Sequence, residues 1–533
     1  MSKADILIQG GQVIDGTGSP AIEADIAITN GKIVAIGPKL TTEAGRVIDA
    51  RNMVVSPGFI DIKTHSDWTV PLNPQGHSKL RQGVTTEVIG HCGYSCAPAL
   101  PGKAGILRDY LSPSAPWLTF VDQSFHDYLG TFPKTSGNFV PLVGHNTLRL
   151  MVMGLADRHA TDDEVNDMIA LAQEAFDAGA FGLSTGLFTP PGAFAATEEI
   201  VALAKIAKGR GGRYFTHLRD EANEVFAALD EAIRVGDESG IHVQVVHMKL
   251  SGLDNWGRAS EMLDRIEAAR ARGVAIDCDQ YPYTAASNPL KNLLPRWVQS
   301  DKIDEMKARL ASPENRARIK QEIATHGLNN FGRIKDWDAI RISVSPHQGQ
   351  YAGRTMLDIA KERGIDPVDC ACDYLIADQC ATRVLVDSIS EDDIQTMIKS
   401  PHVCVGSDGN CVATHGITGQ GRPHPRFYGT FPRIIGHYSQ ELHLIDLPLA
   451  IHKMTGASAK ALGFTDRGLL KTGYAADITL FDPAEFRERA TYQDPHQYPA
   501  GDSTTVLVNG TVTIDHAEHT GALAGDLLKR ASA

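Results

Sequence analysis

Five short runs of the sequence each place a histidine, a cysteine or an aspartate at the end of a predicted β-strand. The residues are His65 in PGFIDIKTHSD, Cys92 in VTTEVIGHCG, His217 in RYFTHLRD, His247 in VQVVHMK and Asp408 in HVCVGSDG. A thiolate, imidazoles and a carboxylate form a ligand set that suits Zn²⁺ and leaves one coordination position open. Each residue alone has an ordinary structural explanation, but their joint placement at five strand ends predicts a metal centre.

Other histidine and cysteine residues are interpreted as structural. His91 directly precedes Cys92, so the alternation of a strand directs its side chain to the opposite face. The Cys370-x-Cys372 pair lacks the second ligand pair of a zinc ribbon. Buried cysteines commonly pack as small apolar side chains, and we expect that role for Cys96, Cys370, Cys372, Cys380 and Cys404.

The segments that carry the candidate ligands alternate β-like apolar runs with helical patterns, which is typical of parallel βα units. Helical patterns cover 162–179, 198–209 and 221–239, and Thr161 with Glu164 is a candidate capping box before the first. Eight candidate strands favour an α/β fold of the (β/α)8 barrel type, whose active sites lie at the carboxyl ends of the strands. These strands are 59–64, 84–89, 139–143, 181–184, 213–216, 243–246, 274–279 and 402–405.

Both ends of the chain carry short strand-like runs separated by Gly-Gly and Asn-Gly turn signals. The pattern predicts one small β domain, residues 1–56 plus 470–533, built from both termini. Residues 57–469 then form the barrel. The stretch at about 290–400 is too long for an ordinary connection, and we expect it to be a helical insertion between the seventh and eighth strands.

The composition is that of a globular protein and narrows the choice of partners. The 533 residues include 51 Lys and Arg against 64 Asp and Glu, a net charge of −13, which argues against nucleic acid or an acidic membrane as the main partner. The 8 cysteines are scattered rather than arranged as a disulfide framework. The amino terminus lacks a signal-peptide pattern. We therefore expect a cytoplasmic protein that acts on a small molecule, in an oligomeric state that the sequence does not define.

The sequence resembles the amidohydrolase superfamily and, within it, the N-acyl-D-amino-acid deacylases, also called D-aminoacylases. The likeness covers nearly the whole chain and includes KLRQGVTTEVIGHCGYSCAP, THLRDE, VQVVHMKLSG, DQYPYTAAS, HPRFYGTFPRIIG and GYAADITLFDP. The resemblance implies a TIM-like (β/α)8 barrel with a small β-sandwich domain formed by both termini. It also implies a hydrolase that acts on carbon–nitrogen bonds other than peptide bonds.

The resemblance implies roles for the residues at the strand ends. Cys92, His217 and His247 match the ligands of one tightly bound zinc, and Asp408 matches the general base that later acts as an acid. His65 is left with two roles, as a weak metal ligand or as a group that positions the attacking water.

Substrate recognition is also implied by the resemblance. Lys249 in HMKLSG, with Tyr283 and Ser287 in QYPYTAAS, matches the groups that hold the α-carboxylate of an N-acyl amino acid. A cation and two hydroxyls just past the sixth and seventh strands are suited to that task because all three lie on the same rim.

The first strand departs from the family pattern. Family members usually carry His-x-His there, whereas this chain has Lys63-Thr64-His65. A protonated ammonium cannot ligate a metal, so Lys63 makes a second metal site doubtful. Three interpretations stay open: Lys63 is a fixed cation that replaces the field of the second metal, it is a modified or deprotonated ligand, or the deacylase activity is altered or lost.

The predicted function is zinc-dependent hydrolysis of N-acyl-D-amino acids to a carboxylate and a free D-amino acid. The main alternative is a cyclic-amide hydrolase of the dihydroorotase or hydantoinase kind. Those enzymes commonly use a carboxylated lysine on the fourth strand, and the fourth strand here, AFGLSTG, contains no lysine. A non-catalytic barrel protein is a third hypothesis, which Lys63 favours and the retained metal ligands oppose.

Overall fold

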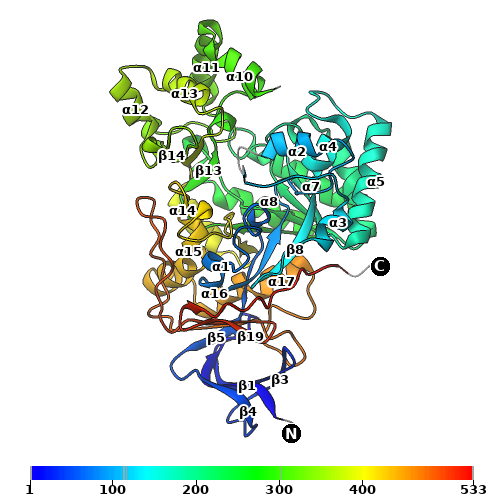
Figure 1. Ribbon diagram of the computed structural model, residues 1–533, viewed down its shortest axis with the longest axis vertical. Coiled ribbons are helices and arrows are strands. Elements are labelled where there is room, and N and C mark those ends of the chain that lie inside the picture. Colours follow the sequence, from blue (N-terminus) through cyan, green and yellow to red (C-terminus); the bar gives the residue numbers. More distant parts are fainter. Residues whose placement is uncertain (1–2, 112–114, 116, 300–301, 531–533) are drawn as a thin grey trace.

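The central element of the molecule is an eight-stranded sheet of parallel strands that curves into a barrel (Figure 1). The computed structural model describes residues 3–111, 115, 117–299 and 302–530. The sheet order is β16-β12-β11-β10-β9-β8-β7-β6. The predicted barrel is confirmed, because each of the eight predicted strands is present: β6 (Phe59–Asp61), β7 (Val84–Ile89), β8 (Asn138–Gly144), β9 (Gly182–Gly186), β10 (Arg213–His217), β11 (Val243–Val245), β12 (Ile276–Gln280) and β16 (Val403–Val405).

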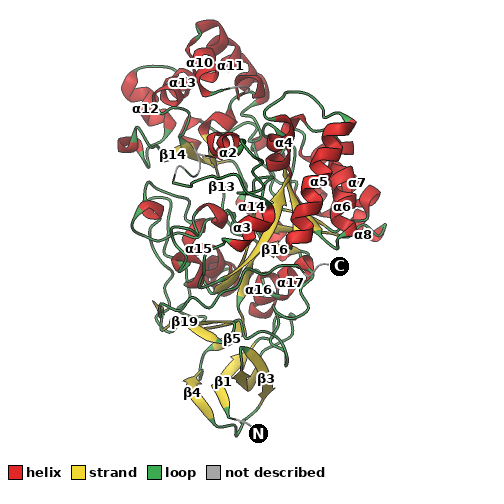
Figure 2. Ribbon diagram, turned by 45° about the vertical axis from the view of Figure 1, so that its right-hand side comes forward, coloured by secondary structure: helices red, strands yellow, loops and turns green. Residues whose placement is uncertain are grey.

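Helices cover the outside of the strands, as Figure 2 shows. The predicted capping box is present, since the Thr161 hydroxyl accepts the Glu164 backbone N–H and the Glu164 carboxylate accepts the Thr161 backbone N–H. Outside the insertion described below, the helices between the barrel strands are α1 (His77–Leu80), α2 (Ala104–Leu111), α3 (Phe125–Gly130), α4 (His145–Met153), α5 (Asp162–Ala178), α6 (Thr197–Gly209), α7 (Val225–Ser239), α8 (Ala259–Ala271) and α14 (Glu391–Lys399). Those that follow the last barrel strand are α15 (Arg426–Arg433), α16 (Leu447–Met454) and α17 (Gly456–Leu462).

A buried ion pair joins the first barrel strand to the loop after the last. The Lys79 ammonium donates to Asp61 Oδ2 and to Ser407 Oγ, both at 2.6 Å, and Asp61 Oδ1 accepts the Ser407 backbone N–H at 2.8 Å. Within the described residues, the loops after β6 and β16 pair through a single parallel bridge between Thr64 and Gly409. The side chains of Asp61, Lys79 and Ser407 therefore supply much of the closure at this seam.

Strands from both termini form one nine-stranded sheet, which lies below the barrel in the view of Figure 1. Antiparallel pairing of β17 with β5 joins the two ends of the chain. Its aliphatic core draws on both ends, for example Ile26 and Ile478. The terminal limits 1–56 plus 470–533 stay a prediction. The strands are β1 (Ala4–Val13), β2 (Ile22–Thr29), β3 (Lys32–Gly37), β4 (Ala44–Asp49), β5 (Val54–Pro57), β17 (Ile478–Phe481), β18 (Thr505–Val508), β19 (Thr511–Asp515) and β20 (Glu518–His519).

The insertion between β12 and β16 differs from the prediction in one respect. It contains a three-stranded antiparallel sheet, β13-β15-β14, besides its helices. The runs IRISV and RVLVD are rich in β-branched residues, and Ile340, Ile342, Val384 and Val386 pack one face against those helices. The elements are β13 (Ala285–Pro289), α9 (Arg296–Gln299), α10 (Ile303–Ala311), α11 (Pro313–His326), β14 (Ile340–Val344), α12 (Met356–Arg363), α13 (Pro367–Ala377) and β15 (Arg383–Asp387).

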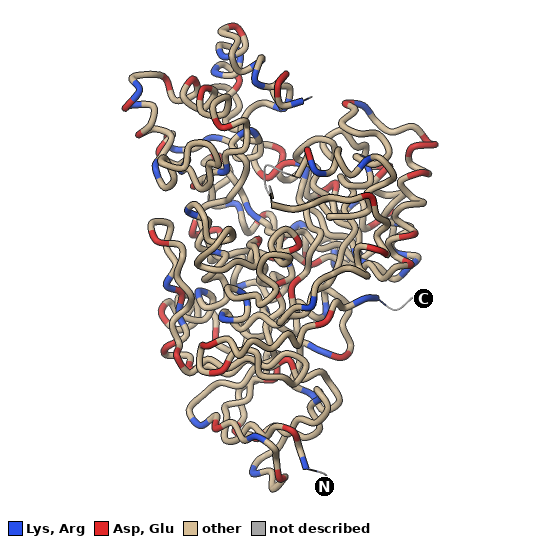
Figure 3. The backbone as a smooth tube through the Cα atoms, in the orientation of Figure 1, with Lys and Arg blue, Asp and Glu red and all other residues tan. Residues whose placement is uncertain are grey.

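Charged residues of both signs are interspersed over all parts of the molecule (Figure 3). No helix among the described residues is both long and apolar enough to cross a membrane. The cytoplasmic location stays a prediction.

The buried Lys79–Asp61 ion pair at the seam should contribute to the stability of the fold. The Lys79→Met substitution leaves the Asp61 carboxylate buried without its cation, and the free energy of unfolding should fall by about 3–5 kcal/mol. Urea denaturation followed by far-UV circular dichroism measures this change. Arg51→Met is the control, because its ion pair with Asp49 is exposed and should change the unfolding midpoint little. Similar losses in the two variants would contradict the role of the seam.

Candidate metal centre and active site

Three predicted ligands come together at the carboxyl-terminal rim of the barrel. Cys92 follows β7, His217 ends β10 and His247 follows β11. Cys92 Sγ lies 3.6 Å from His217 Nδ1 and 3.5 Å from His247 Nε2. All three residues are buried, and among the described residues they are the one group of His, Cys, Asp or Glu whose ligand atoms lie within 4.8 Å of one another. One sulfur and two imidazole nitrogens at this spacing fit a zinc ion.

The electrostatic surroundings prepare the sulfur for a metal. Burial alone would raise the pKa of Cys92, but the Lys63 ammonium and hydrogen bonds from His217 and His247 hold it well below its ordinary value. The thiolate is the form of cysteine that binds metals. The surroundings therefore favour a buried thiolate at Cys92, the form that a metal site requires.

A carboxylate that the sequence analysis did not single out lies behind both imidazoles. Glu221 Oε2 lies 3.3 Å from His217 Nε2, and Glu221 Oε1 lies 3.2 Å from His247 Nδ1. Lys249 and Asn330 also donate to the Glu221 carboxylate. A carboxylate in this position fixes the ring orientation of metal-binding histidines and leaves their inner nitrogens free to ligate. The signal was present in THLRDE, since Glu221 comes four residues after His217.

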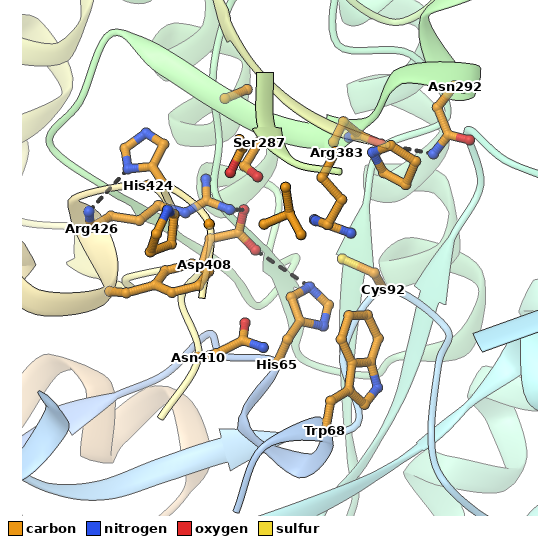
Figure 4. A pocket seen from close by; sticks show the side chains of 18 of the residues that line it. His65, Trp68, Cys92, Ser287, Asn292, Arg383, Asp408, Asn410, His424 and Arg426 are labelled. Atoms are coloured by element: carbon orange, nitrogen blue, oxygen red, sulfur yellow. Dashed lines mark hydrogen bonds and ion pairs between the residues drawn. The ribbon is translucent and has the colours of Figure 1, made fainter. Parts of the chain in front are cut away.

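Asp408 lies between two cations, as Figure 4 shows in part. Its Oδ1 accepts from Lys63 Nζ at 2.7 Å, its Oδ2 pairs with Arg426 Nη2 at 2.7 Å, and His65 Nε2 lies 3.5 Å from Oδ1. Burial would raise the pKa of Asp408, but Arg426, Lys63 and His247 hold it well below its ordinary value. Asp408 is therefore a carboxylate at neutral pH. Arg426 lies in the HPRFYG motif and was not predicted as a site residue.

Lys63 is completely buried beside this carboxylate. Its ammonium also lies 2.9 Å from His65 Nε2. Burial opposes the charged form, but the charges of Asp408 and Cys92 outweigh that cost and raise the pKa of Lys63. Lys63 is therefore a cation in the space between His65 and Asp408.

Three of the site residues have a backbone conformation that L-amino acids rarely adopt. The φ angles of Cys92, His247 and Asp408 are 55°, 38° and 49°. Specific hydrogen bonds hold two of these turns: the His247 N–H donates to Asp279 Oδ1 at 2.7 Å, and the Asp408 N–H donates to the Lys63 carbonyl at 2.8 Å. Left-handed non-glycine residues persist where surrounding contacts enforce them, and they concentrate at functional sites.

These groups lie in a cavity of about 770 Å³ with two contrasting walls. The aromatic wall comes from loops after the first, second and fourth strands and consists of Trp68, Tyr94, Tyr110, Trp117 and Phe188. The polar wall comes largely from the insertion and the loop after β16 and includes Ser287, Lys291, Arg383 and Arg426. His65 stacks on Trp68 with ring centroids 4.7 Å apart. Cys92, His217, His247 and Asp408 line the same cavity.

The predicted carboxylate-binding residues are placed differently from one another. Lys249 and Ser287 line the cavity. Tyr283 is absent from the described residues of the lining, and its hydroxyl donates to Glu488 at 2.8 Å. Tyr281, two residues earlier, lines the cavity instead, and its buried hydroxyl has no hydrogen-bond partner within the described residues. Strand alternation does not predict which tyrosine lines the cavity, because β12 ends at Gln280 and both tyrosines lie in the bend that follows.

The residues interpreted as structural are packed in the interior. His91 is buried and contacts the Phe215 ring edge to face, with centroids 5.4 Å apart. All eight cysteines are free and buried. Ser184 in GLSTG matches a Gly-x-Ser-x-Gly nucleophile pattern. It lies within strand β9 rather than on a turn, and its hydroxyl donates to the Gly90 carbonyl, so it is a structural residue.

Comparison with known proteins agrees with this arrangement. A family model described as "Amidohydrolase family" matches residues 46–514. The chain belongs to the amidohydrolase family. It is 35% identical to a D-aminoacylase of Alcaligenes xylosoxydans xylosoxydans over 99% of this chain and 98% of that one. It is 38% identical to an N-acyl-D-aspartate deacylase of the same organism over 98% of this chain and 94% of that one. The predicted membership of the N-acyl-D-amino-acid deacylase branch is thus confirmed.

Solved structures extend the likeness to three dimensions. One is a D-aminoacylase with a binuclear metal center, for which one-metal activation and second-metal attenuation are described. It has a TM-score of 0.82 at 35% identity, covering 99% of this chain and 100% of that one. An N-acyl-D-glutamate deacylase from Bordetella bronchiseptica, complexed with zinc and a phosphonate inhibitor, has a TM-score of 0.83 at 32% identity, with the same coverage. An L-hydantoinase from Arthrobacter aurescens has a TM-score of 0.57 at 14% identity, a likeness of fold alone.

The arrangement predicts the metal content. The purified protein should hold close to one zinc per chain, and the Cys92→Ala variant should lose it, because the thiolate is one of three ligands. Glu221→Gln should weaken zinc binding about 10–100-fold, as loss of an outer carboxylate does in other sites. Metal analysis and competition with a chelator measure both effects. Two tightly held metals per chain, or unchanged zinc affinity in Glu221→Gln, would contradict this arrangement.

Proposed function

We propose that this protein is a zinc-dependent N-acyl-D-amino-acid deacylase, which hydrolyses the amide bond to release a carboxylate and a free D-amino acid. The observation that carries the proposal is the joint placement of a Cys92, His217 and His247 cluster and the ionised Asp408 in one cavity with a cationic wall. The family membership and the activities named for its relatives support the same assignment.

The chain's own residues would divide the chemical work. Zn²⁺ held by the three ligands supplies a Lewis acid that polarises the scissile carbonyl and makes water more acidic. Asp408 accepts the proton of the attacking water, since it is ionised, and hands it to the leaving amine. His65 lies within 3.5 Å of Asp408, which suits the proposed role of positioning that water.

Lys63 takes the role of a fixed cation in this proposal. Its ammonium lies 2.9 Å from His65 and 2.7 Å from Asp408, the residues on which a second metal would depend. The raised pKa of Lys63 disfavours the interpretation of a deprotonated ligand. We therefore propose a single zinc, with Lys63 supplying positive charge in place of a second one.

The position of Asp408 orients the substrate. The leaving nitrogen must lie next to the group that protonates it, so the amino-acid half lies toward Asp408 and the polar wall. The acyl half then lies toward the aromatic wall formed by Trp68, Trp117 and their neighbours. Apolar rings favour contact with an acyl chain, whereas cations favour contact with a carboxylate.

The α-carboxylate would be held next to the metal ligands. Lys249 Nζ lies 2.8 Å from His247 Nδ1, and Ser287 and Arg383 line the same wall. We assign the tyrosine role to Tyr281 rather than Tyr283, because the Tyr281 hydroxyl is unpartnered beside the cavity. The Arg383 guanidinium provides the bidentate geometry that carboxylates prefer.

The cyclic-amide alternative has less support. Its usual carboxylated lysine lies on the fourth strand, and β9 (Gly182–Gly186) is GLSTG. The contacts of Glu221 to both histidines disfavour a non-catalytic role. A buried carboxylate is costly, and without a metal it would have no ligands to orient.

The first functional prediction concerns the base. Asp408→Asn should lower kcat by about 10²–10⁴-fold while the zinc content stays near wild type, because the amide cannot accept the proton. Asp387→Asn is a matched control, since that aspartate is exposed at the end of β15. A residual rate above about a tenth of the wild-type rate would exclude Asp408 as the base, because that loss lies below the expected range.

The second functional prediction concerns the α-carboxylate. Amidation of the substrate's α-carboxyl group should lower kcat/KM roughly 10–150-fold, the value of a charge-assisted hydrogen bond. Lys249→Met should suffer a similar loss with the free acid and little further loss with the amide. Because Lys249 also pairs with Glu221, zinc content is measured alongside. Equal turnover of acid and amide by the wild type would exclude the carboxylate clamp.

A further inference from the structure

The cavity lining contains one cation, Lys291, that none of the described carboxylates of the lining pairs with. Among the described residues of its lining, the carboxylates are Glu221 and Asp408, and the cations are Lys249, Lys291, Arg383 and Arg426. Lys249 pairs with Glu221 and Arg426 pairs with Asp408. Lys291 has no ion-pair or hydrogen-bond partner for its ammonium within the part of the chain that the structure describes.

The Lys291 ammonium is also largely shielded from water. Burial disfavours the charged form and lowers the pKa of Lys291. An unpaired ammonium in such a position costs free energy, which an incoming carboxylate would recover. Two polar amides flank it on the same lining, and Asn292 Nδ2 donates to Asn288 Oδ1 at 2.7 Å. The surroundings of Lys291 therefore resemble a binding site for an anion more than a solvated surface.

The position of Lys291 separates it from the α-carboxylate. The α-carbon is bonded to the scissile nitrogen, so its carboxylate must lie close to Asp408 and the zinc ligands, within reach of Lys249. Lys291 lies in the insertion, in the 3-10 helix η4 (Leu290–Leu293) that follows β13, and within the described residues its ammonium makes no hydrogen bond or ion pair with the candidate ligands or Asp408. A carboxylate bound at Lys291 would therefore belong to the side chain of the substrate.

We propose that Lys291 binds a side-chain carboxylate of the substrate, so that the enzyme prefers N-acyl derivatives of acidic D-amino acids, D-aspartate or D-glutamate. The inference rests on the proposed deacylase function and specifies its substrate class. A doubly charged substrate would then place its α-carboxylate at Lys249 and its side-chain carboxylate at Lys291, both of which line the cavity.

The test compares charged substrates with neutral ones of the same shape. For the zinc-loaded enzyme, kcat/KM is measured on N-acetyl-D-glutamate and N-acetyl-D-aspartate and on N-acetyl-D-glutamine and N-acetyl-D-asparagine. The wild type should favour the acids by at least about tenfold. Lys291→Met should lower kcat/KM for the acids about 10–150-fold and change it for the amides less than about threefold. Lys291→Arg, which keeps the charge, should retain most of the acid preference.

Controls keep each outcome decisive. Lys361→Met removes an exposed lysine of α12, outside the cavity lining, and should leave all four rates unchanged. Equal losses on acids and amides in Lys291→Met would overturn the proposal, because they would assign Lys291 to the α-carboxylate. If Lys291→Met does not fold, the ratio of acid to amide turnover in the wild type and the rates of Lys291→Arg still test the proposal.

The substrate panel also separates this inference from the function on which it rests. Wild-type turnover of the D-glutamine and D-asparagine derivatives at rates equal to the acids would overturn the acidic preference and leave the deacylase intact. Failure of the zinc-loaded wild type to hydrolyse any N-acyl-D-amino acid, a D-leucine derivative included, would instead overturn the proposed function.

Discussion

The carboxylate of Asp408, buried between the Lys63 ammonium and the Arg426 guanidinium, is the interaction on which the rest of the site depends. Buried charges persist only when they are paired and hydrogen-bonded. The two cations therefore keep Asp408 ionised inside the protein. Lys63 follows β6 and Arg426 begins α15, so the pairing also requires that the first and last parts of the barrel meet. The seam through Asp61 and Lys79 provides that closure.

Glu221 holds the His217 and His247 imidazoles in place from behind, as the two cations hold Asp408. It contacts the outer nitrogen of each histidine and pairs with Lys249. Cys92 and His247, two of the candidate ligands, also have left-handed backbone angles, which strand geometry alone does not enforce. The Glu221 contacts thus set the orientation of the two imidazoles from behind, and a metal would enter a site where these donors are already aligned.

Chemistry and selectivity arise from different parts of the chain. The barrel strands carry the cluster and Asp408, whereas the insertion supplies Ser287, Lys291 and Arg383. Connections over the rim tolerate changes of sequence more readily than the barrel does. In the proposed function, substitutions in the insertion would therefore change the substrate, and substitutions at the barrel strand ends would change the chemistry.

The sequence by itself determined the barrel, its eight strands and the candidate ligands Cys92, His217, His247 and Asp408, because strand periodicity and strand-end position are local properties. It did not reveal Glu221 or Arg426, whose roles arise from contacts between elements. Nor did it distinguish Tyr281 from Tyr283, since the direction of a side chain after a strand end depends on the turn. The β-strands of the insertion were missed because short alternating runs such as RVLVD become strands only by pairing with partners distant in sequence. Only the tertiary structure decided that Lys63 faces Asp408 and that Lys291 faces the cavity without a partner, because the balance of buried charges is a property of the assembled site.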